Sequence, residues 1–160
     1  YKSTRIGKNG KPFTLYKLKT MRDERGPEST SANDPRITKV GHFLRKYKLD
    51  ELPQLWNVIK GDMNLVGPRP EVPEVMELMH TTYPDEYVII TSVKPGITDT
   101  ASLWNYNEEE RLSNEPDPHK AYLEKIWPDK RKLQIQYINN RSFLLDLKIL
   151  IQTLWRIIFR

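Results

Sequence analysis

The sequence predicts an α+β fold, a single and mainly helical domain with a small β-element. Its 160 residues are enough for one compact domain with a core, but too few for two ordinary domains. Apolar residues recur at helical spacing through much of the chain, and only short stretches have strand character. With 38% hydrophobic and 10% aromatic residues, the composition is that of a folded chain rather than a disordered one.

Charge and composition limit the classes of partner and chemistry. Lys and Arg number 26 against 21 Asp and Glu, and the net charge of +5 favours an anionic partner: nucleic acid, lipid headgroups, nucleotides or sugar phosphates. The absence of cysteine excludes disulfides, a thiol nucleophile and Cys-bound zinc, and the three histidines lack metal-site spacing. No run of about 18 apolar residues occurs, so no membrane-spanning helix is predicted.

The first part of the chain predicts a strand, a loop and a broken helix. Phe13 to Leu18 has strand character and follows a cluster of turn-forming residues, while Asp23 to Pro35 is polar and predicts a surface loop. Helical spacing then appears from Val40 to Tyr47 and again from Leu55 to Ile59. Pro53 interrupts it, because proline lacks an N–H and clashes with the carbonyl four residues back. A proline-kinked helix is therefore predicted at this point.

The central part of the chain alternates helices with turns. Gly61 is predicted to end the second helical stretch. The further elements are, in order, a rigid turn over Gly67–Pro70, a helix over Pro73–His80, a short strand over Tyr87–Ile90, a turn at Pro95–Gly96, a loop with helical pieces over Asn105–Lys120, and a helix over Tyr122–Tyr137.

Residues 142–160 predict a strongly amphipathic helix. Its polar stripe consists of Ser142, Asp146, Thr153, Arg156 and Arg160. Its opposite face consists of Phe143, Leu147, Leu150, Ile151, Leu154 and Ile158. Two interpretations stay open: a terminal helix docked on the core, or an interfacial helix lying in a membrane headgroup layer, which Trp155 and Phe159 near its end favour.

Two adjacent carboxylates, Asp50 and Glu51, lie at the predicted proline break. Adjacent acids usually belong to a solvated helix face, but here Leu49, Leu52 and Pro53 surround them with apolar groups. Such a setting tunes the pKa and orientation of a carboxylate. Because basic residues precede the pair, it suits phosphoryl chemistry, in which one carboxylate attacks phosphorus and the other handles a proton or a divalent cation.

Three cations are candidates to bind phosphate. Arg69 stands between Pro68 and Pro70 on a stiff backbone, which pre-organises its planar fork for a phosphate, although an arginine that caps a turn fits equally well. Lys17 and Lys19 would point to one face of a strand, toward a pyrophosphate or only toward water. The GxGxxG and GxxxxGK[ST] patterns are absent, so a conventional phosphate loop is not predicted.

Three blocks of sequence resemble the bacterial sugar transferases, the monotopic phosphoglycosyl transferases that begin glycan assembly on polyprenyl phosphate. The ending SFLLDLKILIQT at residues 142–153 also fits. The resemblance implies that residues 1–160 form the catalytic domain, and that the family's re-entrant membrane helix, normally placed before the first block, is absent from this chain. The blocks are RIGKNGKPFTLYKLKTM at residues 5–21, DPRITKVGHFLRKYKLDELPQLWNVIKGDMNLVGPRP at residues 34–70, and SVKPGITDTASLWNYNEEE at residues 92–110.

The resemblance implies a two-step transfer. In that family the aspartate of the LDELPQ motif, here Asp50, attacks the β-phosphate of a UDP-sugar and expels UMP. Polyprenyl (undecaprenyl) phosphate then attacks the phospho-sugar on the carboxylate. Glu51 would remove a proton from the acceptor or bind a cation. The resemblance also implies Mg²⁺, with Asp50 as its ligand.

The resemblance further implies a membrane-associated enzyme of exopolysaccharide or capsule synthesis, acting at the cytoplasmic face of the bacterial plasma membrane without nucleic acid. Position 19 is Lys where the family commonly has Arg, which keeps the charge but loses the bidentate fork. The alternative is a basic membrane-surface or nucleic-acid-binding module without catalysis. The implied substrate-binding residues are Arg69, Lys17, Lys19, Arg36, Pro68 and Pro70.

Overall fold

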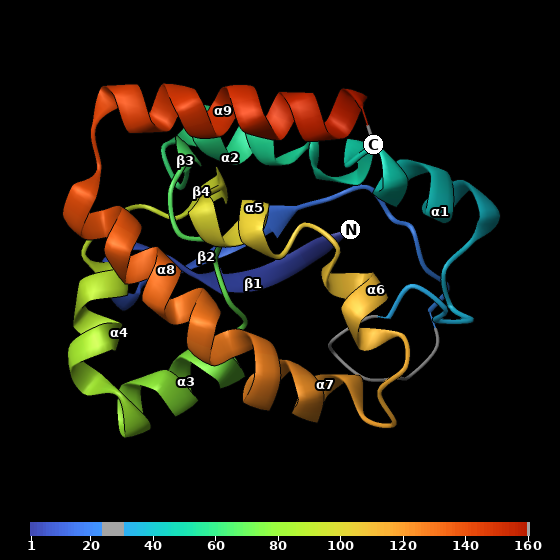
Figure 1. The fold of residues 1–160 in the computed structure, drawn as a ribbon, viewed down its shortest axis with the longest axis horizontal. Coiled ribbons are helices and arrows are strands. Elements are labelled where there is room, and N and C mark those ends of the chain that lie inside the picture. Colours follow the sequence, from blue (N-terminus) through green and yellow to red (C-terminus); the bar gives the residue numbers. More distant parts are fainter. Residues whose placement is uncertain (24–30, 160) are drawn as a thin grey trace.

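The computed structural model describes residues 1–23 and 31–159, and it is the mainly helical α+β domain that the sequence predicts (Figure 1). The predicted strand at residues 13–18 is confirmed only as far as Tyr16, where β2 ends, and the predicted loop over residues 23–35 lies in large part outside the described residues. The strands pair in two short sheets, antiparallel β1 (Lys2–Ile6) with β2 (Pro12–Tyr16) and parallel β3 (Asn64–Val66) with β4 (Gly96–Thr98).

The helices and helical turns follow the predicted order closely. The predicted helices at Pro73–His80 and Tyr122–Tyr137 are confirmed, as are the helical pieces between them and the end of the second helix at Gly61, which has a φ of 84°. The elements are η1 (Lys8–Gly10), α1 (Lys39–Lys46), η2 (Leu49–Glu51), α2 (Gln54–Lys60), α3 (Pro73–Thr82), α4 (Pro84–Thr91), α5 (Thr100–Trp104), α6 (Glu108–Leu112), α7 (Pro118–Ala121), η3 (Tyr122–Ile126), α8 (Trp127–Asn140) and α9 (Phe143–Ile158).

The predicted proline kink is a complete break between two helices. After α1 the chain turns at Lys48, whose φ of 54° is left-handed and cannot continue a helix. The 3₁₀ turn η2 then carries the two carboxylates, and Pro53 begins the restart that becomes α2. Asp50 and Glu51 are thus presented on a turn between two helices.

The predicted strand at residues 87–90 is wrong, because these residues lie inside α4. Pro84 occupies the first turn of the helix, where its missing N–H costs nothing, and Asp85 and Glu86 complement the positive end of the helix dipole. The main core forms where α3 and α4 meet η3 and α8, around buried Met79, Ile126 and other apolar side chains.

Helix α9 is amphipathic as predicted, but its polar stripe faces the protein. Ile149 is buried beside that stripe. Of the two open interpretations, the structure shows a helix docked on the core, through part of the polar stripe together with Ile149 and Leu150, and the interfacial interpretation stays a prediction. The hydrogen bonds that hold α9 include Tyr137 to Asp146 (2.8 Å), Thr98 with Thr153 (2.9 Å) and Arg156 to the carbonyl of Leu103 (2.9 Å).

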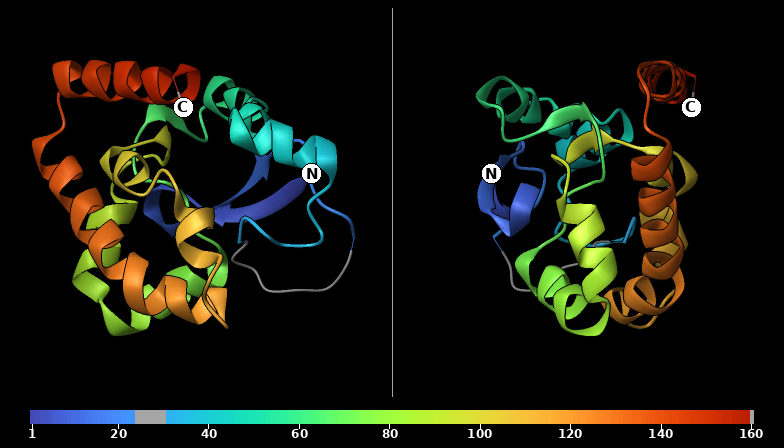
Figure 2. Two further views of the ribbon diagram at one scale, coloured as in Figure 1. Left: turned by 45° about the vertical axis from the view of Figure 1, so that its right-hand side comes forward. Right: turned by 90° about the vertical axis from the view of Figure 1, so that its left-hand side faces the viewer.

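Exposed apolar side chains of α9 lie at the same edge of the molecule as those of α1 and α2. Figures 1 and 2 show α1, α2 and α9 along the same edge of the molecule, away from α3 and α4. None of the helices in the described ranges is long and apolar enough to cross a membrane. The apolar surface consists of Val40 and Phe43 on α1, Leu55, Trp56 and Ile59 on α2, the neighbouring Leu52, and Phe143, Leu144, Leu147, Ile151, Leu154, Trp155 and Ile158 on α9.

Candidate active site

The turn that carries the two carboxylates is fixed by the strand β2 and the residues after it. Asn57 of α2 is fully buried; its Oδ1 accepts a hydrogen bond from the Tyr16 amide (3.2 Å), and its Nδ2 donates to the Thr14 carbonyl (2.7 Å). The amide of Leu18 donates to the carbonyl of Asp50 at 2.9 Å. The hairpin and α2 therefore hold η2 in one position.

The predicted rigid turn around Arg69 is anchored by a close approach of two glycines. The Gly67 amide donates to the Thr98 carbonyl, and the Gly96 amide donates to the Pro68 carbonyl, each at 3.0 Å. A Cβ added to Gly96 would lie 2.1 Å from the Gly67 nitrogen, so no larger residue fits there. Pro68 and Pro70 therefore flank an arginine whose backbone is pinned to β4.

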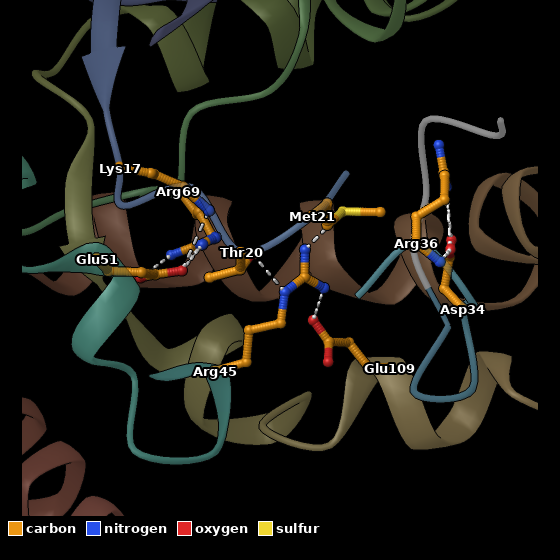
Figure 3. Close-up of polar contacts among 9 residues, drawn as sticks. All are labelled: Lys17, Thr20, Met21, Asp34, Arg36, Arg45, Glu51, Arg69 and Glu109. Atoms are coloured by element: carbon orange, nitrogen blue, oxygen red, sulfur yellow. Dashed lines mark hydrogen bonds and ion pairs between the residues drawn. The ribbon is translucent and has the colours of Figure 1, made fainter. Parts of the chain in front are cut away.

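Glu51 pairs with two of the predicted phosphate-binding cations (Figure 3). Its Oε2 accepts from Arg69 Nη1 at 2.9 Å, and its Oε1 accepts from Lys17 Nζ at 3.3 Å and from Arg69 Nη2. Burial acts to raise the pKa of Glu51, but the charges of Arg69 and Lys17 outweigh it and hold that pKa far below its usual range. We call Lys17, Glu51 and Arg69 the site cluster.

Asp50 differs from its neighbour, because no cation among the described residues pairs with its side chain. The residue is 6% exposed, and its Oδ1 is buried without a hydrogen bond from any described residue. Burial, followed by the negative charge of Glu51, raises the pKa of Asp50, while the charges of Lys17 and Lys48 partly oppose the shift. An unshared carboxylate oxygen beside fixed cations is suited to attack phosphorus or to bind a cation.

Lys19 and Arg36, the other predicted substrate-binding cations, pair away from the site cluster. Because β2 ends at Tyr16, the prediction that Lys17 and Lys19 share one face of a strand is wrong: Lys19 pairs with Asp23 instead. Figure 3 shows Arg36 well away from Glu51, and its Nη2 lies 2.6 Å from an oxygen of Asp34. The structure thus brings together Asp50, Glu51, Lys17 and Arg69, with Pro68 and Pro70 flanking the arginine.

Comparison with known proteins assigns the chain to a family, since the family model described as "Bacterial sugar transferase" matches residues 1–160. The chain belongs to the bacterial sugar transferase family. It is 41% identical, over 99% of its length and 69% of the relative's, to "Uncharacterized sugar transferase EpsL" of Bacillus subtilis. It is 36% identical, over 98% of its length and 32% of the relative's, to "UDP-glucose:undecaprenyl-phosphate glucose-1-phosphate transferase" of Escherichia coli.

A third relative of this sugar transferase is "Undecaprenyl-phosphate glucose phosphotransferase" of Komagataeibacter xylinus, which is 35% identical over 97% of the chain. The chain covers 28% of that relative's length. It thus spans about a third of the length of the Escherichia coli and Komagataeibacter xylinus relatives.

Arg45 is a candidate site residue of the sugar transferase that the sequence did not single out. Its Nε donates to Thr20 Oγ1 at 3.0 Å, and its Nη1 donates to Glu109 at 2.8 Å, so it links α1 to α6 beside the site cluster (Figure 3). Its charge also acts on the pKa of Asp50. The sequence pattern that could have indicated Arg45 is its position one helical turn after Gly41, which is buried and so marks the inward face of α1.

The residues present fit a magnesium ion that is shared with a substrate. Within residues 1–23 and 31–159, no group of three or more His, Cys, Asp or Glu gathers as a ready cation cage. Both oxygens of Glu51 accept hydrogen bonds from Arg69 or Lys17, whereas Asp50 has an oxygen without a hydrogen bond from any described residue. Mg²⁺ is commonly held by one or two carboxylates together with substrate phosphates and water, and Asp50 meets that requirement.

Proposed function

We propose that this protein transfers a sugar 1-phosphate from a UDP-sugar to polyprenyl phosphate, with Asp50 as the nucleophile. The observation that carries the proposal is the contrast at η2, where Asp50 keeps a buried oxygen without a hydrogen bond and Glu51 holds Arg69 and Lys17 beside it. The names of two relatives support the two substrates, since they include UDP-glucose and undecaprenyl phosphate.

In the first step an oxygen of the Asp50 carboxylate forms a bond to the β-phosphorus of the donor. The bond from that phosphorus to the bridging oxygen breaks, and its electron pair leaves with UMP. Arg69 and Lys17 of the site cluster are placed to offset the charge on the transferring phosphoryl group. Mg²⁺ held by Asp50 and the diphosphate would supply further charge neutralisation.

In the second step an oxygen of the polyprenyl phosphate bonds to the same phosphorus, and the bond to Asp50 breaks. The carboxylate is regenerated and the product is a polyprenyl diphospho-sugar. A phosphate monoester has a second pKa near about 6, so at neutral pH its oxygen is mostly ionised and needs no base. We therefore assign Glu51 to positioning Arg69 and Lys17, because both its oxygens are occupied and its lowered pKa makes it a weak base.

The test is the formation of the phospho-sugar adduct without acceptor. Incubation with a panel of UDP-hexoses and Mg²⁺ is expected to release UMP and to add the mass of one phospho-sugar to the intact protein. Asp50→Asn should show neither signal, because its amide is a poor nucleophile. The matched control is Asp85→Asn, which changes an exposed aspartate of α4 and should behave as the unchanged protein. Adduct formation by the Asp50→Asn protein would overturn the assignment.

We also propose that the protein works on the cytoplasmic face of the bacterial plasma membrane, where a UDP-sugar and a polyprenyl phosphate meet. The apolar surface on α1, α2 and α9 supports this, because side chains such as Ile59 (74% exposed) and Ile158 (67% exposed) stand in water without a covering element. Because Asp146 and Thr153 of the polar stripe are hydrogen-bonded to the domain, most of the apolar side of α9 faces outward. This orientation favours an interfacial role for α9.

Flotation with phospholipid vesicles tests the membrane proposal. Ile59→Asp and Ile158→Asp place a charge in the apolar surface and should reduce the fraction that floats. The matched control is Val88→Asp, because Val88 is 64% exposed on α4, a helix that Figure 1 shows away from α9. Equal losses for all three variants would show that the apolar surface has no special affinity for the bilayer.

A further inference from the structure

An open groove lies between α5 and α9, at the margin of the apolar surface. It has a volume of about 340 Å³ and is lined by Leu103 of α5 and by Ile151, Gln152, Trp155 and Arg156 of α9. Ile151 and Trp155 are 58% and 62% exposed, so the groove opens on the side proposed to face the membrane. Its apolar lining fits a hydrocarbon chain better than a nucleotide or a sugar.

Arg156, which lines one part of this groove, lies near the turn that carries Asp50. Tyr106 links the two places: Arg156 Cζ lies 5.7 Å from the centre of its ring, and Lys48 Nζ lies 5.5 Å from the same centre. The Tyr106 hydroxyl also donates to the Arg156 carbonyl at 3.3 Å. Lys48 immediately precedes η2 and lies two residues before Asp50. One aromatic ring thus brings together a cation from α9 and a cation from the catalytic turn.

The two cations suit a phosphate group at this junction. Arg156 donates one N–H to the carbonyl of Leu103, and its guanidinium carries five, so its fork retains donors for an anion. Lys48 brings a second positive charge close enough to act on the pKa of Asp50. An amphiphile with a phosphate head and an apolar chain matches the whole arrangement, with its head beside η2 and its chain along the groove.

We propose that the groove between α5 and α9 binds the isoprenoid chain of the acceptor, and that Lys48 and Arg156 hold its phosphate beside Asp50. This rests on the proposed function, and it adds the place where the second substrate enters. The diphosphate of the donor would bind Arg69 and Lys17 of the site cluster. Donor and acceptor phosphates would therefore be held beside Asp50 by different cations. An acceptor arriving through the apolar surface need not leave the bilayer.

The experiment measures acceptor and donor dependence separately, in neutral detergent micelles. The acceptor probe is a water-soluble prenyl phosphate of two isoprene units, so that affinity for a bilayer does not contribute. Arg156→Ala should raise the KM for this acceptor about ten-fold, as expected for a lost charge-assisted contact, and Arg156→Lys should recover part of it. Ile151→Ser should raise the same KM by a smaller factor. The KM for the UDP-sugar should change less than either.

The matched control is Arg141→Ala, which removes an equal charge just before the other end of α9 and should leave the acceptor KM unchanged. An unchanged acceptor KM in Arg156→Ala would overturn the proposal. A fall only in its affinity for phosphatidylglycerol vesicles would identify an anionic headgroup site instead. If the unaltered protein forms no phospho-sugar adduct, the proposed function itself fails; if the adduct forms and the acceptor KM does not respond, only the groove assignment fails.

Discussion

Two ion clusters hold opposite ends of the same short segment, and they differ in access to solvent. In the site cluster, Glu51 of η2 pairs with Arg69. Two residues later Glu71 belongs to a buried cluster, in which Lys130 Nζ lies 2.6 Å from Glu71 Oε1 and the Tyr122 hydroxyl donates to the same oxygen at 2.6 Å. Lys130 also donates to the Tyr122 oxygen at 2.8 Å.

The difference teaches what a paired cation can do. In the site cluster the side chains of Arg69 and Lys17 are 29% and 22% exposed, whereas that of Lys130 is 7% exposed. The cations of the first cluster can be shared with an anion that arrives from solvent. The cation of the second is closed to any ligand, so the buried cluster serves the fold by holding the backbone that carries Arg69.

The largest effect is expected from breaking the buried cluster. Lys130→Met leaves the carboxylate of Glu71 buried without its cation, and it should lower the free energy of unfolding by about 3–5 kcal/mol. Urea unfolding at pH 7 measures this. The double change Lys130→Met with Glu71→Leu should recover most of the loss, since no charge is then left unpaired. A loss below about 1 kcal/mol in the single variant would contradict the contrast between the clusters.

A smaller effect is expected from the same kind of change in the site cluster. Glu51→Gln removes the partner of Arg69 and Lys17, and it should lower the free energy of unfolding by about 2 kcal/mol at pH 7, because both cations can still reach water. The reaction should slow as well, since the two cations lose their orientation. A loss of unfolding free energy as large as that of Lys130→Met would show that the site cluster is closed to solvent.

The pH dependence of this loss gives a second check. The pKa of Glu51 is lowered on folding, so its stabilising contribution is present above the unfolded pKa of about 4.3 and is lost as the pH falls below it. The difference in unfolding free energy between the unchanged protein and Glu51→Gln should therefore shrink between pH 5 and pH 3. A constant difference over that range would contradict a charged, paired Glu51.

Asp50→Asn should raise the free energy of unfolding, whereas Glu51→Gln lowers it. The pKa of Asp50 is raised by burial, so its ionised form destabilises the fold above the unfolded pKa of about 3.9, and this penalty disappears at lower pH. The variant should gain about 1 kcal/mol at pH 7, as is common where function costs stability, and little at pH 3. Differential scanning calorimetry measures both, with Glu77→Gln, which changes an exposed carboxylate in the middle of α3, as the control. A loss of stability at pH 7 would mean that the carboxylate is partnered.

The sequence predicted the break at Pro53 and the turn at Arg69 because both depend on local backbone chemistry. Proline fixes its own φ and lacks an N–H, and the close approach of the two backbones at Gly67 and Gly96 needs glycine. The strand predicted at residues 87–90 failed for a related reason. A run of four apolar residues does not distinguish a strand from a helix, and Pro84 was the local signal that decided for α4.

Features that depend on how elements pack were less accessible. Periodicity identified the two faces of α9, but it does not say which face turns inward, and hydrogen bonds from Tyr137 and Thr98 decide that. The same holds for Arg45, because its part in the site depends on α6 placing Glu109 against α1. The pairing of Glu51 with Arg69 joins residues 18 apart and needs the completed fold.

The smallest effect is expected at Lys19, and it separates exposure from access to substrate. The side chain of Lys19 is 52% exposed and pairs with Asp23, whereas Lys17 is 22% exposed and pairs with Glu51 beside Asp50. Lys19→Ala should change the free energy of unfolding by less than about 0.5 kcal/mol, as for other surface ion pairs, and should raise the KM for the UDP-sugar less than about two-fold. Lys17→Ala should raise that KM about ten-fold, because it removes a cation that Glu51 holds beside Asp50. Steady-state kinetics on both variants decide the matter. If Lys19→Ala has the larger effect, the donor phosphates bind where cations are most exposed, and the site cluster is not their binding place.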